Sequence, residues 1–136
     1  MPIINSIASW LMKKRMHQIE LFVKYPHEVQ NEWLQNLVFD AKDTEFGIRH
    51  HFSSIKNYEQ FKRNIPLHDY ESLKPSIERT RRGEQNLLWP GEIKWFAKSS
   101  GTTDKSKFIP VSTESLDGCH YNAGRDMVTL HCINNP

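Results

Sequence analysis

The sequence lacks the features that mark secreted and membrane proteins. It has only two cysteines, Cys119 and Cys132, without framework spacing, so we expect reduced thiols and no disulfide scaffold. No run approaches the roughly 20 apolar residues that a membrane-spanning helix needs. The apolar stretch 3–12 has no basic region before it and runs into three basic residues at 13–15, the wrong polarity for a signal peptide. We therefore expect a cytoplasmic protein with no membrane partner.

An excess of charge of one sign is also missing. The 136 residues include 18 Lys and Arg and 16 Asp and Glu, which gives a formal net charge of +2. This near balance gives no electrostatic footprint for nucleic acid. The densest basic cluster, at 79–82, is read as a solvated helix end whose cations suit the helix dipole. The chain has no internal repeat, and it is long enough for one compact domain with a core.

Metal-ligand spacing is absent as well. The pair His50-His51 has no third ligand at a usable interval, and adjacent residues seldom point the same way. The pairs Cys119-His120 and His131-Cys132 lack the usual zinc intervals, so we expect them to be buried residues of a final helix. We assign no metal ligand and no catalytic proton-transfer residue. Gly124 in the same helix costs stability relative to alanine, which suggests a close packing contact.

Apolar residues at helical spacing predict two N-terminal helices. The first covers about residues 3–24, and Pro26 opens the second in the position that proline tolerates best. We expect these helices to pack as a hairpin over residues 1–43.

Shorter elements follow the hairpin. Residues 44–52 are expected to form a loop, and Asn57 with Gln60 predicts a capped helix to about Arg63. Asp69 caps another turn, and Pro75 begins a further helix that Gly83 ends. A final helix starts after Ser112 or Thr113, with Glu114 in its first turn.

The stretch 94–111 is the part of the chain that looks suited to chemistry. Two short apolar runs, 93–97 and 108–111, flank a run of small hydroxylated residues with one glycine, which predicts a strand, a polar loop and a second strand. Gly101 lacks a Cβ and lets the backbone approach phosphate oxygens. The candidate anion-binding residues are Ser99, Ser100, Gly101, Thr102, Thr103 and Lys107, with Lys105 and Lys98 as further sources of positive charge.

Two interpretations of this loop stay open on composition alone. Serine, glycine and aspartate are also the usual residues of an ordinary solvated hairpin loop. A general nucleotide P-loop needs a second glycine directly before its lysine, and no glycine follows Gly101 before the lysines. A P-loop kinase or GTPase is therefore disfavoured.

The residues 100–107, Ser-Gly-Thr-Thr-Asp-Lys-Ser-Lys, resemble the phosphate loop of the luciferase-like adenylate-forming superfamily. Asp104 and Ser106 stand where that loop usually has glycine and often proline. Ordered matches from about Thr44 onward resemble the N-terminal part of the auxin-responsive Gretchen Hagen family. They are Gly47, Phe52, Tyr58, Phe61, Ile65-Pro66-Leu67, Asp69-Tyr70, Ile77-Glu78-Arg79, Gly83-Glu84, Leu88-Trp89-Pro90-Gly91, Phe96-Ala97-Lys98-Ser99 and Phe108-Ile109-Pro110.

The resemblance implies an α/β fold in which a strand, phosphate loop, strand and helix begin the ATP-binding adenylation domain at residues 44–136. It also implies an acyl-acid amido synthetase that uses ATP and Mg²⁺, a carboxylic acid and an amine or amino acid. The magnesium ligand and the substrate pockets would lie in the remainder of the chain. We expect this fragment to be inactive alone and able to self-associate.

Two other classes of function remain. A small stand-alone module could use the same loop to bind a nucleotide or phosphorylated ligand without catalysis. A helical interaction protein would present the apolar faces of its terminal helices to a partner and bind no nucleotide. Neither class accounts for the ordered matches that precede the loop.

Overall fold

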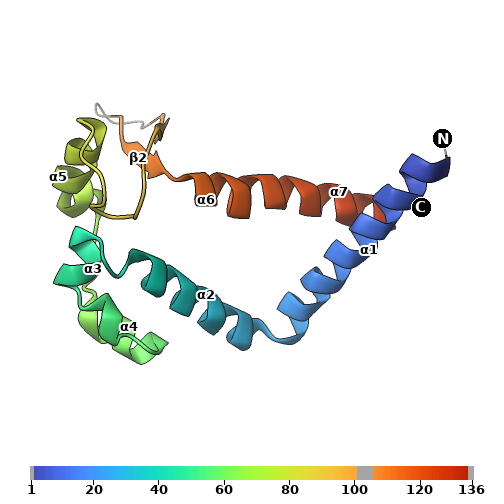
Figure 1. Cartoon of the computed structure of the whole chain (residues 1–136), viewed down its shortest axis with the longest axis horizontal. Coiled ribbons are helices and arrows are strands. Elements are labelled where there is room, and N and C mark those ends of the chain that lie inside the picture. Colours follow the sequence, from blue (N-terminus) through green and yellow to red (C-terminus); the bar gives the residue numbers. More distant parts are fainter. Residues whose placement is uncertain (1, 101–105, 135–136) are drawn as a thin grey trace. The chain divides into compact units, whose positions relative to one another are not determined.

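The computed structural model describes residues 2–100 and 106–134, with side chains from Trp10 onward. Its elements are α1 (Pro2–Lys24), α2 (Pro26–Ala41), α3 (Glu45–Arg49), the 3-10 turn η1 (Phe52–Ser54), α4 (Tyr58–Asn64), α5 (Tyr70–Arg81), β1 (Trp95–Lys98), β2 (Phe108–Val111), α6 (Thr113–Ser115), the π-helical segment η2 (Leu116–Tyr121) and α7 (Asn122–Asn134) (Figure 1). The described chain is thus mostly helical with a two-stranded antiparallel sheet. This agrees with the expected mixture of helices and strands.

The chain contacts divide into two compact units. One unit contains residues 31–113, and the other contains residues 1–30 and 114–136. Within the second unit, α1 packs against α7. The domain division expected from the sequence, at residues 43 and 44, stays a prediction.

The core of the larger unit lies where the end of α2 meets η1. Val38, Ala41, Phe52 and Ile55 are its buried members. Leu34, Phe46, Phe61, Ile65 and Trp89 pack against them. Helical spacing on α2 and the apolar residues around Phe52 bring these side chains to one side, so burial of apolar surface holds α2, α3 and α4 together.

The expectation of a loop at 44–52 is wrong, because Thr44 caps a short helix there. The Thr44 hydroxyl accepts a hydrogen bond from the Gly47 N–H at 2.9 Å and donates one to the Ala41 carbonyl at 2.7 Å. The free N–H groups of Glu45 and Phe46 donate to the carbonyls of Asn86 and Leu87. The partners at 86 and 87 are more than 40 residues away in the sequence, which is why local patterns did not reveal the helix.

The expectation that Pro75 begins a helix is also wrong. Asp69 caps a single helix, α5, by accepting a hydrogen bond from the Ser72 N–H at 2.8 Å, and Pro75 lies inside it. An internal proline removes one helical hydrogen bond and is unfavourable by about 3 kcal/mol in an isolated helix. The burial of Ile77 and Thr80 beyond it offsets that cost.

Two other helix ends lie where the sequence predicted them. The Gln60 N–H donates to the Asn57 carboxamide oxygen at 3.0 Å, as a capping residue requires. The Gln60 side chain accepts from the Lys56 N–H rather than from Asn57, so the reciprocal bond is shifted by one residue. Gly83 has φ +97° directly after α5, which confirms the predicted helix stop.

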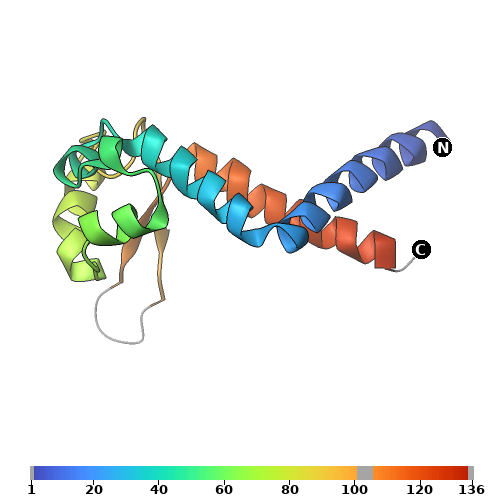
Figure 2. The same ribbon diagram turned by 90° about the horizontal axis from the view of Figure 1, so that it is seen from below.

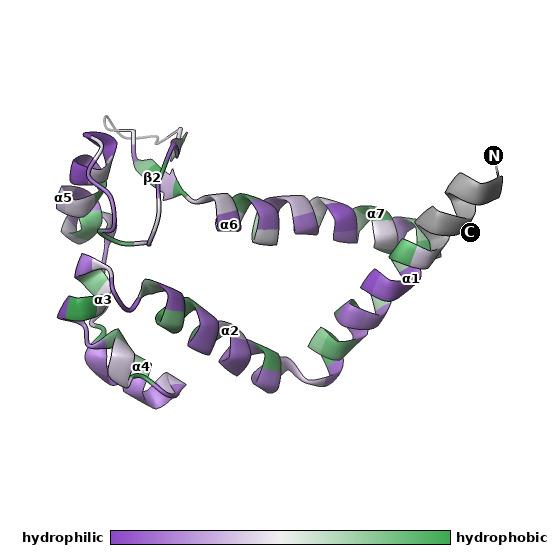
Figure 3. Cartoon of the chain, viewed as in Figure 1, coloured by the Kyte–Doolittle hydropathy of each residue, from purple (hydrophilic) through white to green (hydrophobic). Residues whose placement is uncertain are grey.

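The expected burial of the pairs Cys119-His120 and His131-Cys132 in the final helix is wrong, because all four residues are exposed. Met127 and Val128 are also exposed, whereas Thr129 is buried. A Cβ added at Gly124 would meet no described heavy atom within 4 Å, so the packing contact suggested for this glycine is absent among the described residues. Apolar and polar residues are mixed along α7 and along α2, as Figure 3 shows. On α2 the exposed apolar residues are Trp33, Leu37 and Phe39.

Candidate functional site

The two strands form a hairpin that frames the candidate loop. Trp95 pairs with Val111 at one end of the sheet and Lys98 with Phe108 at the other, and Figure 2 shows the strands side by side. Beyond the last pair, the Ser99 N–H donates to the Lys107 carbonyl at 2.9 Å, and the Lys107 N–H lies 3.3 Å from the Ser99 hydroxyl oxygen. These contacts extend the hairpin to the first and last candidate residues. The first strand was predicted at 93–97, whereas β1 covers Trp95–Lys98 and is therefore shifted toward the C-terminus.

The structure places three of the six candidate residues. Ser99 is half-buried, and Ser100 and Lys107 are exposed. Gly101, Thr102 and Thr103 lie outside the described residues. The described chain therefore brings Ser99 and Lys107 together across the hairpin.

Helix α5 packs beside β2 and contacts the end of the hairpin. The Phe108 N–H donates to the Tyr70 hydroxyl oxygen at 3.0 Å, and the Lys107 ammonium lies 5.2 Å from the centre of the Tyr70 ring. At the other end of α5, the Arg81 guanidinium stacks on the ring of Phe108 in β2, 3.8 Å from the ring centre. Tyr70 and Arg81 were not among the residues predicted for the site. In the sequence, Tyr70 was noted only as one of the ordered family matches. Its contact with the hairpin could not be predicted, because the packing of α5 against β2 is a tertiary feature.

A pocket of about 380 Å³ lies between α5 and the described ends of the hairpin. Its lining combines lysines with carboxylates, and consists of Tyr70, Glu71, Lys74, Glu78, Lys98, Ser106, Lys107 and Phe108. Both carboxylates have cationic partners on their own helix: Glu71 pairs with Lys74 at 3.2 Å and Glu78 with Arg81 at 2.9 Å. Among the described residues, Lys98 and Lys107 have no carboxylate within ion-pair distance. The hairpin side of the pocket therefore favours an anion.

Asp69, directly before α5, is a further carboxylate whose charge interacts with that of Lys107. Hydrogen bonds from the Ser72 backbone N–H and hydroxyl lower the pKa of Asp69, and the positive charge of Lys107 contributes to the same shift. An ionised Asp69 suits its position at the positive N-terminal end of α5. Its carboxylate is engaged with the helix backbone, so it stabilises the start of α5 next to Tyr70.

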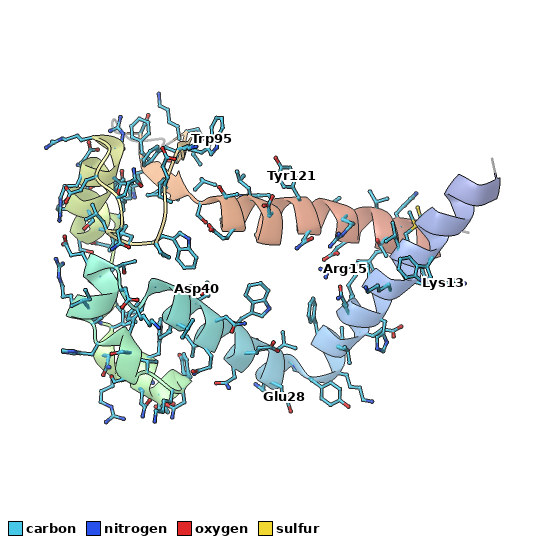
Figure 4. All side chains as sticks on the ribbon, in the orientation of Figure 1. Lys13, Arg15, Glu28, Asp40, Trp95 and Tyr121 are labelled. Atoms are coloured by element: carbon cyan, nitrogen blue, oxygen red, sulfur yellow. The ribbon has the colours of Figure 1, made fainter. Side chains whose placement is uncertain are left out.

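A second pocket, of about 450 Å³, is lined by residues of α1 and α7 within the smaller unit. Its lining includes Arg15, which points from α1 toward α7 in Figure 4. The Arg15 guanidinium makes a two-point contact with Asp126, with one N–O distance of 2.7 Å. This contact lowers the pKa of Asp126 mainly through the hydrogen bond from Arg15. Arg15 is thus already paired and is not a free anion receptor.

His50, His68 and Phe46 form a cluster of rings in the larger unit. The rings of His50 and His68 lie 5.6 Å apart, and both pack against Phe46. Within residues 2–100 and 106–134, no group of three or more His, Cys, Asp or Glu side chains is arranged to hold a metal ion. The same part of the chain contains no helix with the length and apolar character needed to cross a membrane.

The model of the GH3 family N-terminal domain matches residues 15–134, so the chain belongs to the GH3 family. This is the family that the ordered motif matches resemble, and the match covers both the helices and the hairpin.

Curated relatives include plant amido synthetases. The chain is 30% identical over 107 residues to indole-3-acetic acid-amido synthetase GH3.5 of Arabidopsis thaliana, covering 77% of this chain and 18% of that protein. It is 31% identical over 106 residues to GH3.2 of the same plant, covering 76% and 19%. A probable indole-3-acetic acid-amido synthetase GH3.2 of Oryza sativa subsp. japonica is 29% identical over 106 residues, covering 76% and 17%. The matched part of the chain thus spans less than a fifth of these relatives.

Proposed function

We propose that this chain is the N-terminal portion of a cytoplasmic, ATP-dependent acyl-acid amido synthetase and contributes its phosphate-binding loop. The observation that carries the proposal is the end of the hairpin, where Ser99 pairs with Lys107 and where neither Lys98 nor Lys107 has a described carboxylate within ion-pair distance. In the sequence, Ser-Gly-Thr-Thr at 100–103 lies between Ser99 and Lys107. Membership of the GH3 family and the names of the curated relatives support the reaction class.

The proposed reaction has two steps. A carboxylate oxygen attacks the α-phosphorus of ATP, the bond to the β-phosphate oxygen breaks, and pyrophosphate leaves. An amine then attacks the acyl carbon of the adenylate, loses a proton, and forms an amide as AMP leaves. The first step requires the triphosphate to be held in line for attack and the charge on the leaving pyrophosphate to be neutralised.

The loop residues have binding rather than proton-transfer roles in this scheme. Hydroxyl and backbone N–H groups of residues 99–103 donate to the β- and γ-phosphate oxygens, and Gly101 permits their close approach. Lys107 supplies positive charge, and its place beside Lys98 in an anion-favouring pocket supports that role. As the family resemblance implies, we propose that the ligands of Mg²⁺, like the acyl and amine pockets, lie in other parts of the protein.

The exposed apolar residues of α2 are consistent with a larger protein. Trp33, Leu37 and Phe39 are 47–64% exposed. We propose that further parts of the same protein cover them, and that the isolated fragment is inactive and prone to self-association.

The first experiment is to measure the intact mass of the native polypeptide that carries this sequence. A mass several-fold above 16.0 kDa is expected, and ATP–pyrophosphate exchange should then be detectable with a panel of carboxylic acids. A mass near 16.0 kDa would mean that the synthetase activity is not the protein's own.

The loop is tested by replacing Thr102 and Thr103 with valine in that native polypeptide. Loss of the two hydroxyl donors should lower the rate of ATP–pyrophosphate exchange by at least about tenfold. In other enzymes, removal of a single donor to a developing anion often lowers the rate by more than that. Thr113→Val is the matched control, because Thr113 is an exposed threonine outside the loop. Unchanged exchange in the double variant would remove the loop from the mechanism.

A further inference from the structure

We propose that Tyr70 is a positioning residue for the loop lysine: its hydroxyl fixes the first residue of β2, and its ring holds the Lys107 ammonium at the pocket. This inference rests on the proposed function of the loop. It adds a residue from α5, outside the loop motif, to the machinery that binds the triphosphate.

The hydroxyl contact follows from the register of the hairpin. Ser99 donates to the Lys107 carbonyl across the ladder, so the next residue on β2, Phe108, directs its N–H away from β1. An outward N–H on a two-stranded sheet has no partner within the sheet and bonds to water or to a group of another element. The Tyr70 hydroxyl oxygen supplies that partner at 3.0 Å. Tyr70 therefore anchors β2 at the residue that follows Lys107.

The ring contact acts on the charge itself. The Lys107 ammonium lies 5.2 Å from the centre of the Tyr70 ring, within the range of a cation–π interaction. Lysine has a flexible four-carbon stem, so an unrestrained ammonium would sample many positions. Holding it at the pocket wall reduces the ordering that phosphate binding would otherwise require.

Tyr70 is itself held in place by the start of α5. It is the first residue of that helix, and the preceding Asp69 caps the helix through the Ser72 N–H at 2.8 Å. Arg81, three turns along the same helix, stacks on the Phe108 ring at 3.8 Å. Two points of α5 thus contact the same residue of β2, which gives Tyr70 a rigid base.

The test compares Tyr70→Phe and Tyr70→Leu in the native full-length polypeptide. Phenylalanine keeps the ring and removes the hydroxyl, whereas leucine removes both contacts. Tyr58→Phe is the matched control, because Tyr58 is also the first residue of a helix with an Asn or Asp cap but is 61% exposed. Active sites are titrated by acyl-adenylate formation, so that a loss of folded protein does not count as a loss of rate.

We expect Tyr70→Phe to lower the kcat of ATP–pyrophosphate exchange by about fivefold, the effect of one neutral hydrogen bond, with a smaller change in KM for ATP. Tyr70→Leu should lower it further, and Tyr58→Phe should match the wild type. Hydrogen exchange of peptides covering residues 106–111 should become faster in both Tyr70 variants. A purely structural role would change the number of active sites without changing kcat per site.

Lys107→Ala separates this inference from the proposed function. If Lys107→Ala lowers exchange while Tyr70→Leu retains the wild-type kcat per site, the role of Tyr70 is refuted and the loop function stands. If Lys107→Ala exchanges at the wild-type rate, Lys107 is not the charge of a phosphate loop, and both proposals for it are refuted. In the Lys107→Ala background, Tyr70→Leu should add less than it does in the wild type, and full additivity would overturn the inference.

Discussion

At the residue scale, Gly47 shows how a single missing side chain permits a fold. It is buried inside α3, and a Cβ built there would lie 2.0 Å from the Ala41 carbonyl oxygen. The obstructing atom belongs to the backbone at the end of α2, so no rotamer change can relieve the clash. The close approach of α3 to the end of α2 therefore requires glycine at this position.

Replacing Gly47 with alanine should destabilise the chain despite the better helix propensity of alanine. We expect a loss of about 3 kcal/mol in the free energy of unfolding from overpacking, partly offset by roughly 1 kcal/mol of propensity. Urea denaturation of the purified chain measures the difference. Gly124→Ala is the matched control, because Gly124 lies in α7 with no described atom near its added Cβ. Alanine there should be neutral or stabilising, and equal effects at both sites would contradict the packing argument.

Thr44 is the second residue whose chemistry decides local structure. Its side chain is fully buried, and its hydroxyl both donates to Ala41 and accepts from Gly47. Thr44→Val keeps the shape but leaves a buried N–H and a buried carbonyl without this partner. We expect a loss of about 1–3 kcal/mol in the free energy of unfolding. Thr44→Ser retains the hydroxyl and should lose clearly less, so a serine variant as unstable as the valine variant would show that the methyl group matters instead.

At the element scale, an arginine joins the end of α5 to the start of α3. The Arg79 guanidinium donates to both carboxylate oxygens of Glu45, at 3.0 and 2.7 Å, and also binds Glu84. Arg49 donates to Glu45 at 2.7 Å from within α3. Hydrogen bonds from Arg79 lower the pKa of Glu45 and of Glu84 below their ordinary value of 4.5. This network orients α5, from which Tyr70 reaches the hairpin.

The network should make stability depend on pH in the acid range. A carboxyl group whose pKa is lower in the folded chain stabilises it fully above the unfolded value and stops doing so as pH falls through the folded value. Arg79→Met should therefore be less stable than the wild type at pH 7, and the gap should narrow as pH falls below about 4.5. Denaturation midpoints at pH 7 and pH 3 give the comparison.

Arg63→Met serves as the control for the Arg79 experiment, because Arg63 is an exposed arginine at the end of α4. The difference in stability between Arg63→Met and the wild type should be small and nearly independent of pH. A gap for Arg79→Met that is as large at pH 3 as at pH 7 would show that the packing of the arginine stem, not its charge, is what stabilises the chain.

At the scale of the whole molecule, the described chain brings together residues that are far apart in sequence. Arg15 and Asp126 are separated by 111 residues and form a two-point ion pair between α1 and α7. Their side chains are 14% and 26% exposed. Such a pair, partly screened from water, couples two helices that have little other apolar burial among their described residues.

A double-mutant cycle with Arg15→Met and Asp126→Ala should reveal this coupling. We expect an interaction free energy of about 1–2 kcal/mol in denaturation of the chain at low salt, since the hydrogen bonds are charge-assisted and partly buried. The exposed pair His17 and Glu20, 3.7 Å apart, is the control and should show no measurable coupling. Additive effects of the Arg15 and Asp126 substitutions would mean that α1 and α7 associate by other contacts.

The sequence determined the features that depend on neighbouring residues. Caps at Asn57 and Asp69, the stop at Gly83, the two long N-terminal helices and the hairpin strands all follow from local backbone chemistry and apolar spacing. The ordered motifs also determined the family. The phosphate loop itself stays a prediction, because its central residues lie outside the described chain.

Only the tertiary structure decided the features that depend on distant partners. Helix α3 exists because carbonyls at 86 and 87 satisfy its first N–H groups, and α5 continues through Pro75 because Ile77 and Thr80 are buried beyond it. Tyr70 reaches Phe108 because α5 packs on β2, 38 residues away in sequence. Local propensity is set within a few residues, whereas these contacts depend on the free energy of burial and pairing across the folded chain.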